Sequence, residues 1–185
     1  MTLVELLEKN NNYTHFGYFT TDKENRHKYC SQLYDELFAP FQDKEINFLE
    51  IGIAGAGSLA LWHDYFNKAN VYGVDIQKHF DDSKLIDYPR VKTIIDNAYS
   101  EELVQTLPDL DIAVDDGPHN LESWINFLKL YIPKVKTGGI LVIEDIDSIE
   151  SVVELEKHVG DLENHFLDLR NMTGCYDNIV FVVRK

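Results

Sequence analysis

The 185-residue sequence has few cysteines, few basic residues and no long hydrophobic run. Cys30 and Cys175 are its only cysteines, and neither sits in a CxxC motif, which excludes a disulfide framework and a CxxC metal or redox site. Lys and Arg number 17 against 32 Asp and Glu, and the formal charge is −15. Such a chain repels phosphate backbones and anionic lipid, so we expect neither nucleic acid nor a membrane as a partner.

The missing hydrophobic segments also bear on where the protein resides. The longest apolar run, residues 51–62, is rich in Gly and Ala and is too short to span a membrane. The start, MTLVELLEKN, mixes acidic with apolar residues and lacks the basic stretch of a secretory signal. We therefore expect a cytoplasmic, soluble protein whose 185 residues form a single domain.

Strand-like and helix-like segments alternate from residue 46 onward. Helical patterns occupy residues 58–66, 99–107 and 120–131, and the apolar strands between them are 46–52, 71–76, 91–96, 110–116 and 139–145. This alternation is typical of a parallel sheet covered on both faces. The last two strand-like segments, HFLDLR and NIVFVVRK, are joined by NMTGCYD, which is too short for a helical crossover. The sequence predicts an α/β fold, a doubly wound and mostly parallel seven-stranded sheet with a C-terminal antiparallel hairpin.

Residues 1–45 differ from this pattern and are expected to form a helical and loop cap on the core sheet, residues 46–185. Residues 2–9 have helical spacing, with Thr2 as the N-cap. Residues 10–25 are polar and rich in turn formers. Residues 26–38 are predicted to be a helix that places Tyr29, Leu33, Leu37 and Phe38 on one face.

Every strand before the hairpin ends in glycine or a polar residue. In a doubly wound sheet, ligands bind beyond the carboxyl ends of the strands, near the point where strand order reverses. These strand ends are therefore the expected ligand-binding edge, and they carry Gly52, Asp75, Asp96, Asp115–Asp116 and Glu144–Asp145.

The segment LEIGIAGAGS, residues 49–58, is a candidate cofactor loop. Glycines between a strand and a helix let the backbone approach a ligand closely. Asp75, at the end of the next strand, suits the two hydroxyls of a ribose. Together these features favour a cofactor that contains adenosine. The alternative is that the glycines only allow close packing and that Asp75 caps a loop.

Two adenosine cofactors compete for this loop, a nicotinamide dinucleotide and S-adenosylmethionine. The terminal hairpin favours S-adenosylmethionine, because nicotinamide-binding sheets usually continue parallel. Glu50, just before the first glycine, also suits the cationic methionine end of that cofactor.

Several segments resemble the class I S-adenosylmethionine-dependent methyltransferases, and in particular the macrocin- and mycinamicin-type sugar O-methyltransferases. The resemblance begins at residue 21, and Pro118 replaces the family's usual serine. The sequence is short, and we expect it to lack the N-terminal domain that some members carry, which leaves open its oligomeric state and how it closes over a substrate. The similar segments are TDKENRHKY, FLEIGIAGAGSLALW, IIDNAYS, VDDGPHN and GGILVIEDI.

The resemblance and the residue chemistry together imply a sugar O-methyltransferase. A hydroxyl becomes a good nucleophile when a divalent cation lowers its pKa and a base removes its proton. Asp116, Glu144 and Asp145 end two strands expected to be neighbours, and such an all-oxygen set suits Mg²⁺ or Mn²⁺. Asp116 and His119 are the predicted catalytic residues, with His119 as the general base.

The predicted contacts of the cofactor spread over all the strand ends. Asp96 and Asn97 are candidates for the adenine edge, and His27 and Tyr29 for contact with cofactor or substrate. The full predicted cofactor set is Tyr29, Glu50, Gly52, Gly55, Gly57, Ser58, Asp75, Ile76, Asp96, Asn97 and Asp115. The expected partners are a sugar acceptor and, as a possibility that the sequence leaves open, a second copy of the chain.

Other interpretations remain open at this point. The acids could be solvated strand-end residues, with His119 capping the helix that starts at Asn120. A catechol-type O-methyltransferase would also use strand-end carboxylates, but with a lysine where this chain has His119. A non-catalytic cofactor-binding subunit would have no need for three carboxylates in register, and a nicotinamide oxidoreductase is the remaining alternative.

Overall fold

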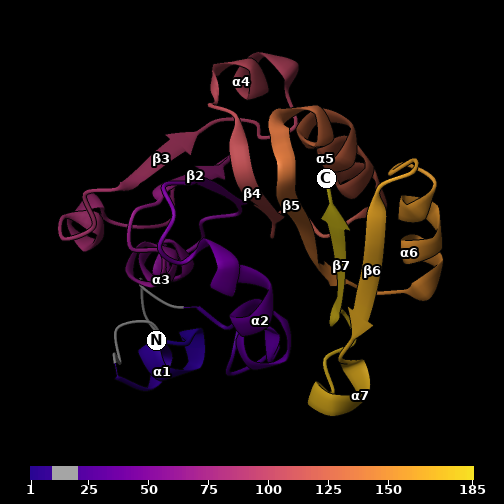
Figure 1. The fold of residues 1–185 in the computed structure, drawn as a ribbon, viewed down its shortest axis with the longest axis horizontal. Coiled ribbons are helices and arrows are strands. Elements are labelled where there is room, and N and C mark those ends of the chain that lie inside the picture. The colour runs from indigo at the N-terminus through magenta and orange to yellow at the C-terminus, as the bar shows by residue number, and fades with distance from the viewer. Residues whose placement is uncertain (10–20) are drawn as a thin grey trace.

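The structure, a computed structural model, describes residues 1–9 and 21–185. Its centre is a seven-stranded sheet in the order β3-β2-β1-β4-β5-β7-β6 (Figure 1). The strands are β1 Asn47–Ile51, β2 Asn70–Asp75, β3 Val91–Ile95, β4 Leu110–Asp115, β5 Val135–Ile146, β6 Glu163–Asp168 and β7 Ile179–Arg184. The order reverses between β1 and β4, which places the expected ligand-binding edge at the carboxyl ends of those two strands.

The strand directions confirm the predicted fold. The strands β3, β2, β1, β4 and β5 pair in parallel, whereas β7 pairs antiparallel with both β5 and β6. Because β7 runs antiparallel to its neighbour β5, its first residue lies beside the end of β5, with Ile179 opposite Ile146. The start of β7 therefore joins the same edge of the sheet as the ends of the parallel strands.

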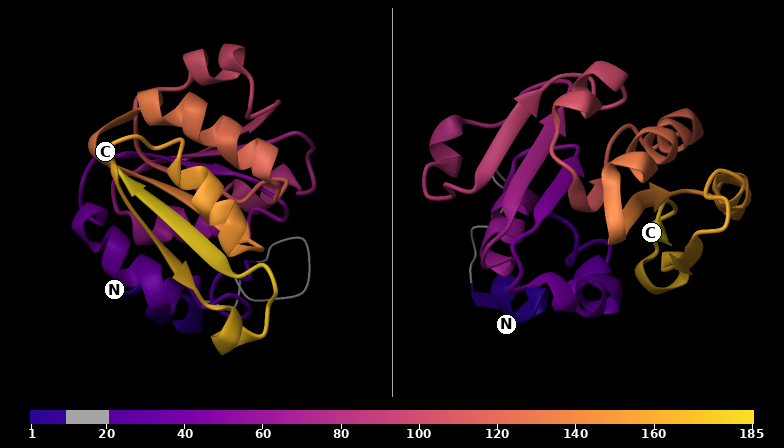
Figure 2. Two further views of the ribbon diagram at one scale, coloured as in Figure 1. Left: turned by 90° about the vertical axis from the view of Figure 1, so that its right-hand side faces the viewer. Right: turned by 45° about the horizontal axis from the view of Figure 1, so that its top comes forward.

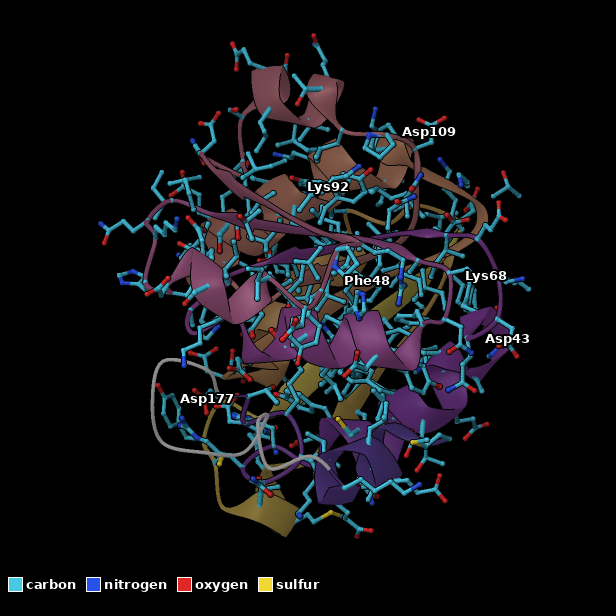
Figure 3. All side chains as sticks on the ribbon, turned by 90° about the vertical axis from the view of Figure 1, so that its left-hand side faces the viewer. Asp43, Phe48, Lys68, Lys92, Asp109 and Asp177 are labelled. Carbon is cyan, nitrogen blue, oxygen red and sulfur yellow. The ribbon has the colours of Figure 1, made fainter. Side chains whose placement is uncertain are left out.

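Helices cover both faces of the sheet, as the left view in Figure 2 shows. One face packs against α1 (Leu3–Lys9), α2 (Asp35–Phe38) and α3 (Gly57–Tyr65), and the other against α4 (Glu101–Thr106), α5 (Leu121–Lys134) and α6 (Ile149–Glu156). Alternate residues of each strand enter the two cores, so that Phe48, labelled in Figure 3, faces the first core and Leu49 the second. The short α7, Arg170–Thr173, follows β6.

The cap follows the prediction at its start and departs from it in the second helix. Thr2 caps α1 as predicted, because its Oγ1 accepts the Glu5 N–H at 3.0 Å. Residues 10–20 of the predicted turn-rich stretch lie outside the described residues. In the second helix, Cys30–Tyr34 (η2) is a π-helix, in which the Asp35 N–H donates to the Cys30 carbonyl five residues earlier. The wider turn buries Tyr34, where uniform α-helical spacing predicts Leu33.

Two further elements differ from the sequence prediction. The helix α6 was not predicted, and β5 begins at Val135, four residues before the predicted strand starts at Gly139. Lys136 and Thr137 among the added residues are polar, but Val135 pairs with Leu110 across an irregular register, and the Gly138 N–H donates to the Lys185 carbonyl. In the described part of the chain, no helix has both the length and the apolar character that a membrane crossing requires.

Candidate active site

The loop after β1 packs directly against the end of β4. Gly52 has φ of 90°, and a Cβ atom at this position would lie 2.0 Å from the Asp116 carbonyl oxygen, so that only glycine fits. Asp75 fixes the other side of the loop, because its Oδ2 accepts the N–H groups of Ile53 (2.8 Å) and Ala54 (3.3 Å). The glycine loop therefore connects the ends of β1, β2 and β4.

A cavity of about 680 Å³ opens along these strand ends. Its lining includes seven of the predicted site residues: Gly52, Asp75, Ile76, Asn97, Asp116, His119 and Asp145. A neighbouring cavity of about 480 Å³ is bordered by Lys23, Gly52, Ser58 and Asp116. The two cavities share the glycine loop and the end of β4.

Six of the predicted cofactor residues, Tyr29, Glu50, Gly55, Gly57, Asp96 and Asp115, line neither cavity, and Gly55, Gly57 and Asp96 lie in or beside the loops that border them. Gly55 lies in the turn before α3, and Gly57 is the first residue of that helix. Asp96 accepts the N–H of Asn97 at 2.7 Å and so shapes the backbone beside the cavity. These residues hold the loops that border the cavity, and their contact with a cofactor stays a prediction.

A buried group of charges, which we call the Lys23 cage, lies beneath the strand ends. The Lys23 ammonium contacts Glu50 Oε1 at 3.1 Å, Glu144 Oε2 at 2.5 Å and Asp116 Oδ2 at 3.0 Å. Ser58 Oγ donates to Glu50 at 2.6 Å, and the Tyr34 hydroxyl donates to Glu144. Burial alone would lower the pKa of Lys23, but the surrounding carboxylates outweigh it and hold that pKa well above its usual range.

Above the cage, Asp116, His119 and Asp145 form a second group, which we call the His119 cluster. One ligand atom from each of the three lies within 4.8 Å of the others. His119 Nε2 is 3.2 Å from Asp116 Oδ1 and 3.6 Å from Asp145 Oδ2. The hydrogen bond to Asp116 raises the pKa of His119 to about 9. All three residues of the cluster line the larger cavity, whereas Lys23 borders only the smaller one.

The backbone of the His119 cluster is held in an unfavourable conformation. His119 and Asp145 have φ of 51° and 57°, in the left-handed region that side chains other than glycine seldom adopt. Such strain persists where surrounding structure enforces it, and it concentrates at functional sites. Asn120, not His119, caps α5, because Asn120 Oδ1 accepts the Ser123 N–H at 3.0 Å. The interpretation of His119 as a helix cap is therefore wrong.

Glu144 was predicted as a ligand of the metal, but the structure does not bring its carboxylate into the His119 cluster. Both Glu144 oxygens are engaged in the cage, one by Lys23 and the other by Tyr34. Regular strand alternation does not produce this difference, because the register of β5 is irregular between Ile143 and Ile146 and Asp145 has φ of 57°. Burial raises the pKa of Glu144 well above its usual range, against the effect of Lys23.

Tyr29 and His27 lie behind Asp145. The Tyr29 hydroxyl donates to Asp145 Oδ1 at 2.6 Å, and His27 Nδ1 is 3.3 Å from the same oxygen. Both side chains are almost fully buried and line neither cavity, in contrast to the contact with cofactor or substrate predicted for them. They position the carboxylate of Asp145.

Asp115 lines neither cavity and is fully buried. Its Oδ1 accepts the Tyr99 hydroxyl at 2.7 Å and the Gly117 N–H at 3.1 Å. Its Oδ2 accepts no hydrogen bond from the described residues. Burial raises the pKa of Asp115 to about 7. Tyr99 and Gly117 both line the cavity, so Asp115 fixes part of its wall.

Comparison with known proteins shows which family this chain resembles. No protein-family model matches the chain. The 8-demethyl-8-alpha-L-rhamnosyl tetracenomycin-C 2'-O-methyltransferase of Streptomyces olivaceus is 34% identical over 69% of the chain, and the mycinamicin VI 2''-O-methyltransferase of Micromonospora griseorubida is 32% identical over 61%. The MycE methyltransferase, solved in complex with Mg and SAH, superposes on the whole chain with a TM-score of 0.73 at 25% identity. By fold and sequence, the chain is a relative of the sugar O-methyltransferases.

The chain spans only part of these sugar O-methyltransferases. The matched segments cover 35% of the tetracenomycin enzyme and 30% of the mycinamicin enzyme, and the structural match covers 55% of MycE. The predicted resemblance and the predicted Rossmann-like fold are confirmed.

In this relative of the sugar O-methyltransferases, the sequence did not predict Lys23, the residue at the centre of the cage. Lys23 lies in TDKENRHKY, one of the segments that carry the resemblance, but no residue pattern shows that its ammonium is buried. Tyr34 and Tyr99 were missed for the same reason, because a tyrosine in an amphipathic helix or beside a loop is indistinguishable from a core residue. The three acids around Lys23, which are Glu50, Asp116 and Glu144, were all predicted site residues. Three acids so close together need a cation, and this need was the one signal that could have pointed to a buried lysine.

Proposed function

We propose that this chain carries the catalytic unit of a Mg²⁺-dependent, S-adenosylmethionine-dependent O-methyltransferase that acts on a sugar hydroxyl. The observation that supports the proposal best is the His119 cluster, in which Asp116, His119 and Asp145 converge at a cavity bordered by the glycine loop. The relatives are named for methyl transfer to sugars, in line with this chemistry. Residues 1–185 act as one domain in this proposal, with residues 1–45 as a cap.

The cofactor fits the cavity from the β2 and β3 side. Asp75, with its second oxygen near the Gln77 N–H at 3.0 Å, meets the ribose, and the exposed Ile76 beside it offers an apolar surface to the adenine. Asn97 borders the same region. The methionine end lies toward Ser58 and Gly52, next to the Lys23 cage. The bound cofactor supplies an electrophilic methyl group.

Asp116 and Asp145 are the proposed metal ligands. Two carboxylates with room for water suit Mg²⁺, which keeps several waters and oxygen ligands in protein sites. The cation, when bound, lowers the pKa of the acceptor hydroxyl. Lys23 holds the second oxygen of Asp116, and Tyr29 holds one oxygen of Asp145, so both carboxylates are oriented before any ligand arrives.

His119 is the proposed general base. Its Nε2 faces the same space as the two carboxylates, within reach of an oxygen placed among them. A lysine at this position would indicate a catechol-type enzyme, so His119 favours the sugar-modifying group. Because a sugar hydroxyl is less acidic than a phenol, it needs both the cation and the base.

The test is methyl transfer itself. The chain is incubated with methyl-labelled S-adenosylmethionine and a panel of rhamnosides and deoxysugar glycosides, with Mg²⁺ or with excess EDTA, and products are read by mass spectrometry. We expect label in a sugar only when Mg²⁺ or Mn²⁺ is present. Full transfer in EDTA would remove the metal from the proposal. Calorimetric binding of NAD in place of S-adenosylmethionine would overturn the assignment to methyltransferases.

A further inference from the structure

The loop that leads into β7 carries a carboxylate that the proposed reaction does not use. This residue, Asp177, lies before Asn178, which is fully buried and tightly held. Asn178 Nδ2 donates to the His27 carbonyl at 3.1 Å and to Thr173 Oγ1 at 2.7 Å, and the Asn178 carbonyl accepts the Leu169 N–H at 2.9 Å. The backbone position of Asp177 is therefore fixed by its neighbour.

The Asp177 side chain is 9% exposed and lines the same cavity as the His119 cluster. Its Oδ1 is buried and accepts no hydrogen bond from the described part of the chain. A buried acceptor without a partner destabilises a folded protein unless a ligand supplies the missing donor. Figure 3 labels Asp177 toward the end of the molecule that carries α7.

The order of strands places Asp177 relative to the other parts of the site. Along the edge of the sheet, Asp75 ends β2, Gly52 follows β1, Asp116 follows β4, Asp145 lies near the end of β5, and Asp177 precedes β7. The His119 cluster therefore lies between the proposed cofactor side and Asp177. A methyl acceptor must approach the cluster from the side opposite the cofactor, which is the side of Asp177.

We propose that Asp177 binds a second hydroxyl of the acceptor sugar, while the hydroxyl that is methylated lies at the His119 cluster. This inference rests on the proposed function and names its substrate class more closely, as a sugar with at least two free hydroxyls. Arg26 lines the same cavity, and its positive charge interacts with that of Asp177, which favours a neutral hydroxyl over an amino group as the donor. Asp177 thus selects and orients the acceptor and takes no part in proton transfer.

The test compares Asp177→Ala and Asp177→Asn with the parent on matched pairs of rhamnosides that have or lack one hydroxyl. In Asp177→Ala we expect KM for the hydroxylated acceptor to rise about 10-fold or more, the range of a lost hydrogen bond to a charged group. The ratio of kcat/KM for the hydroxylated acceptor to kcat/KM for its deoxy analogue should fall toward one. Asp177→Asn, which keeps an acceptor oxygen, should fall between. The exposed Asp161→Ala serves as the control and should behave as the parent.

Two further readings separate this role from a structural one. The Tm of Asp177→Ala should equal or exceed that of the parent, because the variant removes an unpartnered buried acceptor, and the affinity for S-adenosylmethionine should not change. Unchanged KM and selectivity in Asp177→Ala, with an active parent, would overturn this inference alone. A loss of cofactor affinity would assign Asp177 to the cofactor and would also overturn it. A parent that methylates no sugar would overturn the proposed function and this inference together.

Discussion

The Lys23 cage and the His119 cluster both consist of carboxylates at the ends of neighbouring strands, but the charge of these carboxylates is neutralised in different ways. The cage contains its own cation, and Lys23, Glu50 and Glu144 are all almost fully buried. The cluster faces the cavity, and its carboxylates meet two histidines, His119 and His27. Asp116 belongs to both groups, with one oxygen on Lys23 and the other on His119.

The difference shows how charge is divided between structure and function. Buried carboxylates are tolerated only when they are paired, and the cage pairs them permanently with an ammonium. The cluster keeps its pairing exchangeable, because a proton on a histidine can leave and a divalent cation can enter. Changes in the cage should therefore affect folding, and changes in the cluster should affect turnover.

The largest expected effect is on turnover, from His119→Ala. Loss of an acid–base group costs on the order of 10²–10⁴-fold in turnover, equivalent to roughly 3–5 kcal/mol of activation free energy. We expect the affinities for Mg²⁺ and S-adenosylmethionine, measured by calorimetry, to stay near those of the parent. The exposed His165→Ala is the control. A large loss of Mg²⁺ affinity in His119→Ala would instead make His119 a ligand of the cation.

Lys23→Met should break the cage and reduce stability. The substitution leaves Glu50, Glu144 and Asp116 without their common cation, and removing one partner of a buried ion pair costs about 3–5 kcal/mol. Urea unfolding should show this loss, whereas Lys28→Met, which removes an exposed ammonium 3.4 Å from Glu24, should stay within about 1 kcal/mol of the parent. If Lys23→Met were as stable as Lys28→Met, the buried acids would be neutral, and the cage would not be an ion network.

The smallest effect concerns pH. Burial alone would lower the pKa of His27, but the Asp22 hydrogen bond and the charge of Asp145 raise it to about 9. A raised pKa stabilises the fold fully below the unfolded value of about 6.5 and loses this contribution as pH rises through 9. In EDTA, the free energy of unfolding should therefore fall by roughly 1–3 kcal/mol between pH 6.5 and 9.

His119, with a pKa also raised to about 9, contributes to this fall with the same sign. His27→Gln should therefore flatten the slope without abolishing it. Thermal unfolding of both proteins across this range measures the effect. An identical slope in the parent and in His27→Gln would show that His27 stays neutral in the folded protein.

The sequence predicted the fold and the carboxylates of the His119 cluster because both depend on the order and the ends of the strands. Parallel strands bring their carboxyl ends to one edge, so Asp116 and Asp145 could be placed together from the order of strands alone. The segment 21–29 follows no such rule. Its path across the sheet is set by tertiary packing, and so Lys23 could not be assigned to the cage, nor Tyr29 to the back of Asp145.

Glu144 illustrates the limit most clearly. Its position at a strand end predicted a metal ligand as well as it did for Asp145. In the structure, however, Lys23 and Tyr34 hold Glu144, whereas Asp145 lies beside His119. Which of the two faces the cavity depends on where the capping residues Lys23 and Tyr34 lie. That information resides in contacts between segments more than 100 residues apart, such as Tyr34 with Glu144, whose separation in sequence is 110 residues.

The π-helix η2 makes the spacing of two tyrosines part of the site. Tyr29 and Tyr34 are five residues apart, yet their hydroxyls reach the adjacent residues Asp145 and Glu144. In a regular α-helix each residue turns about 100° around the axis, so residues five apart would diverge by about 140°. The extra residue in the π-helical turn of η2 changes the angle between the two side chains, so that both tyrosines of the cap point at the end of β5. In relatives, the number of residues between these two tyrosines should therefore vary less than the residues themselves.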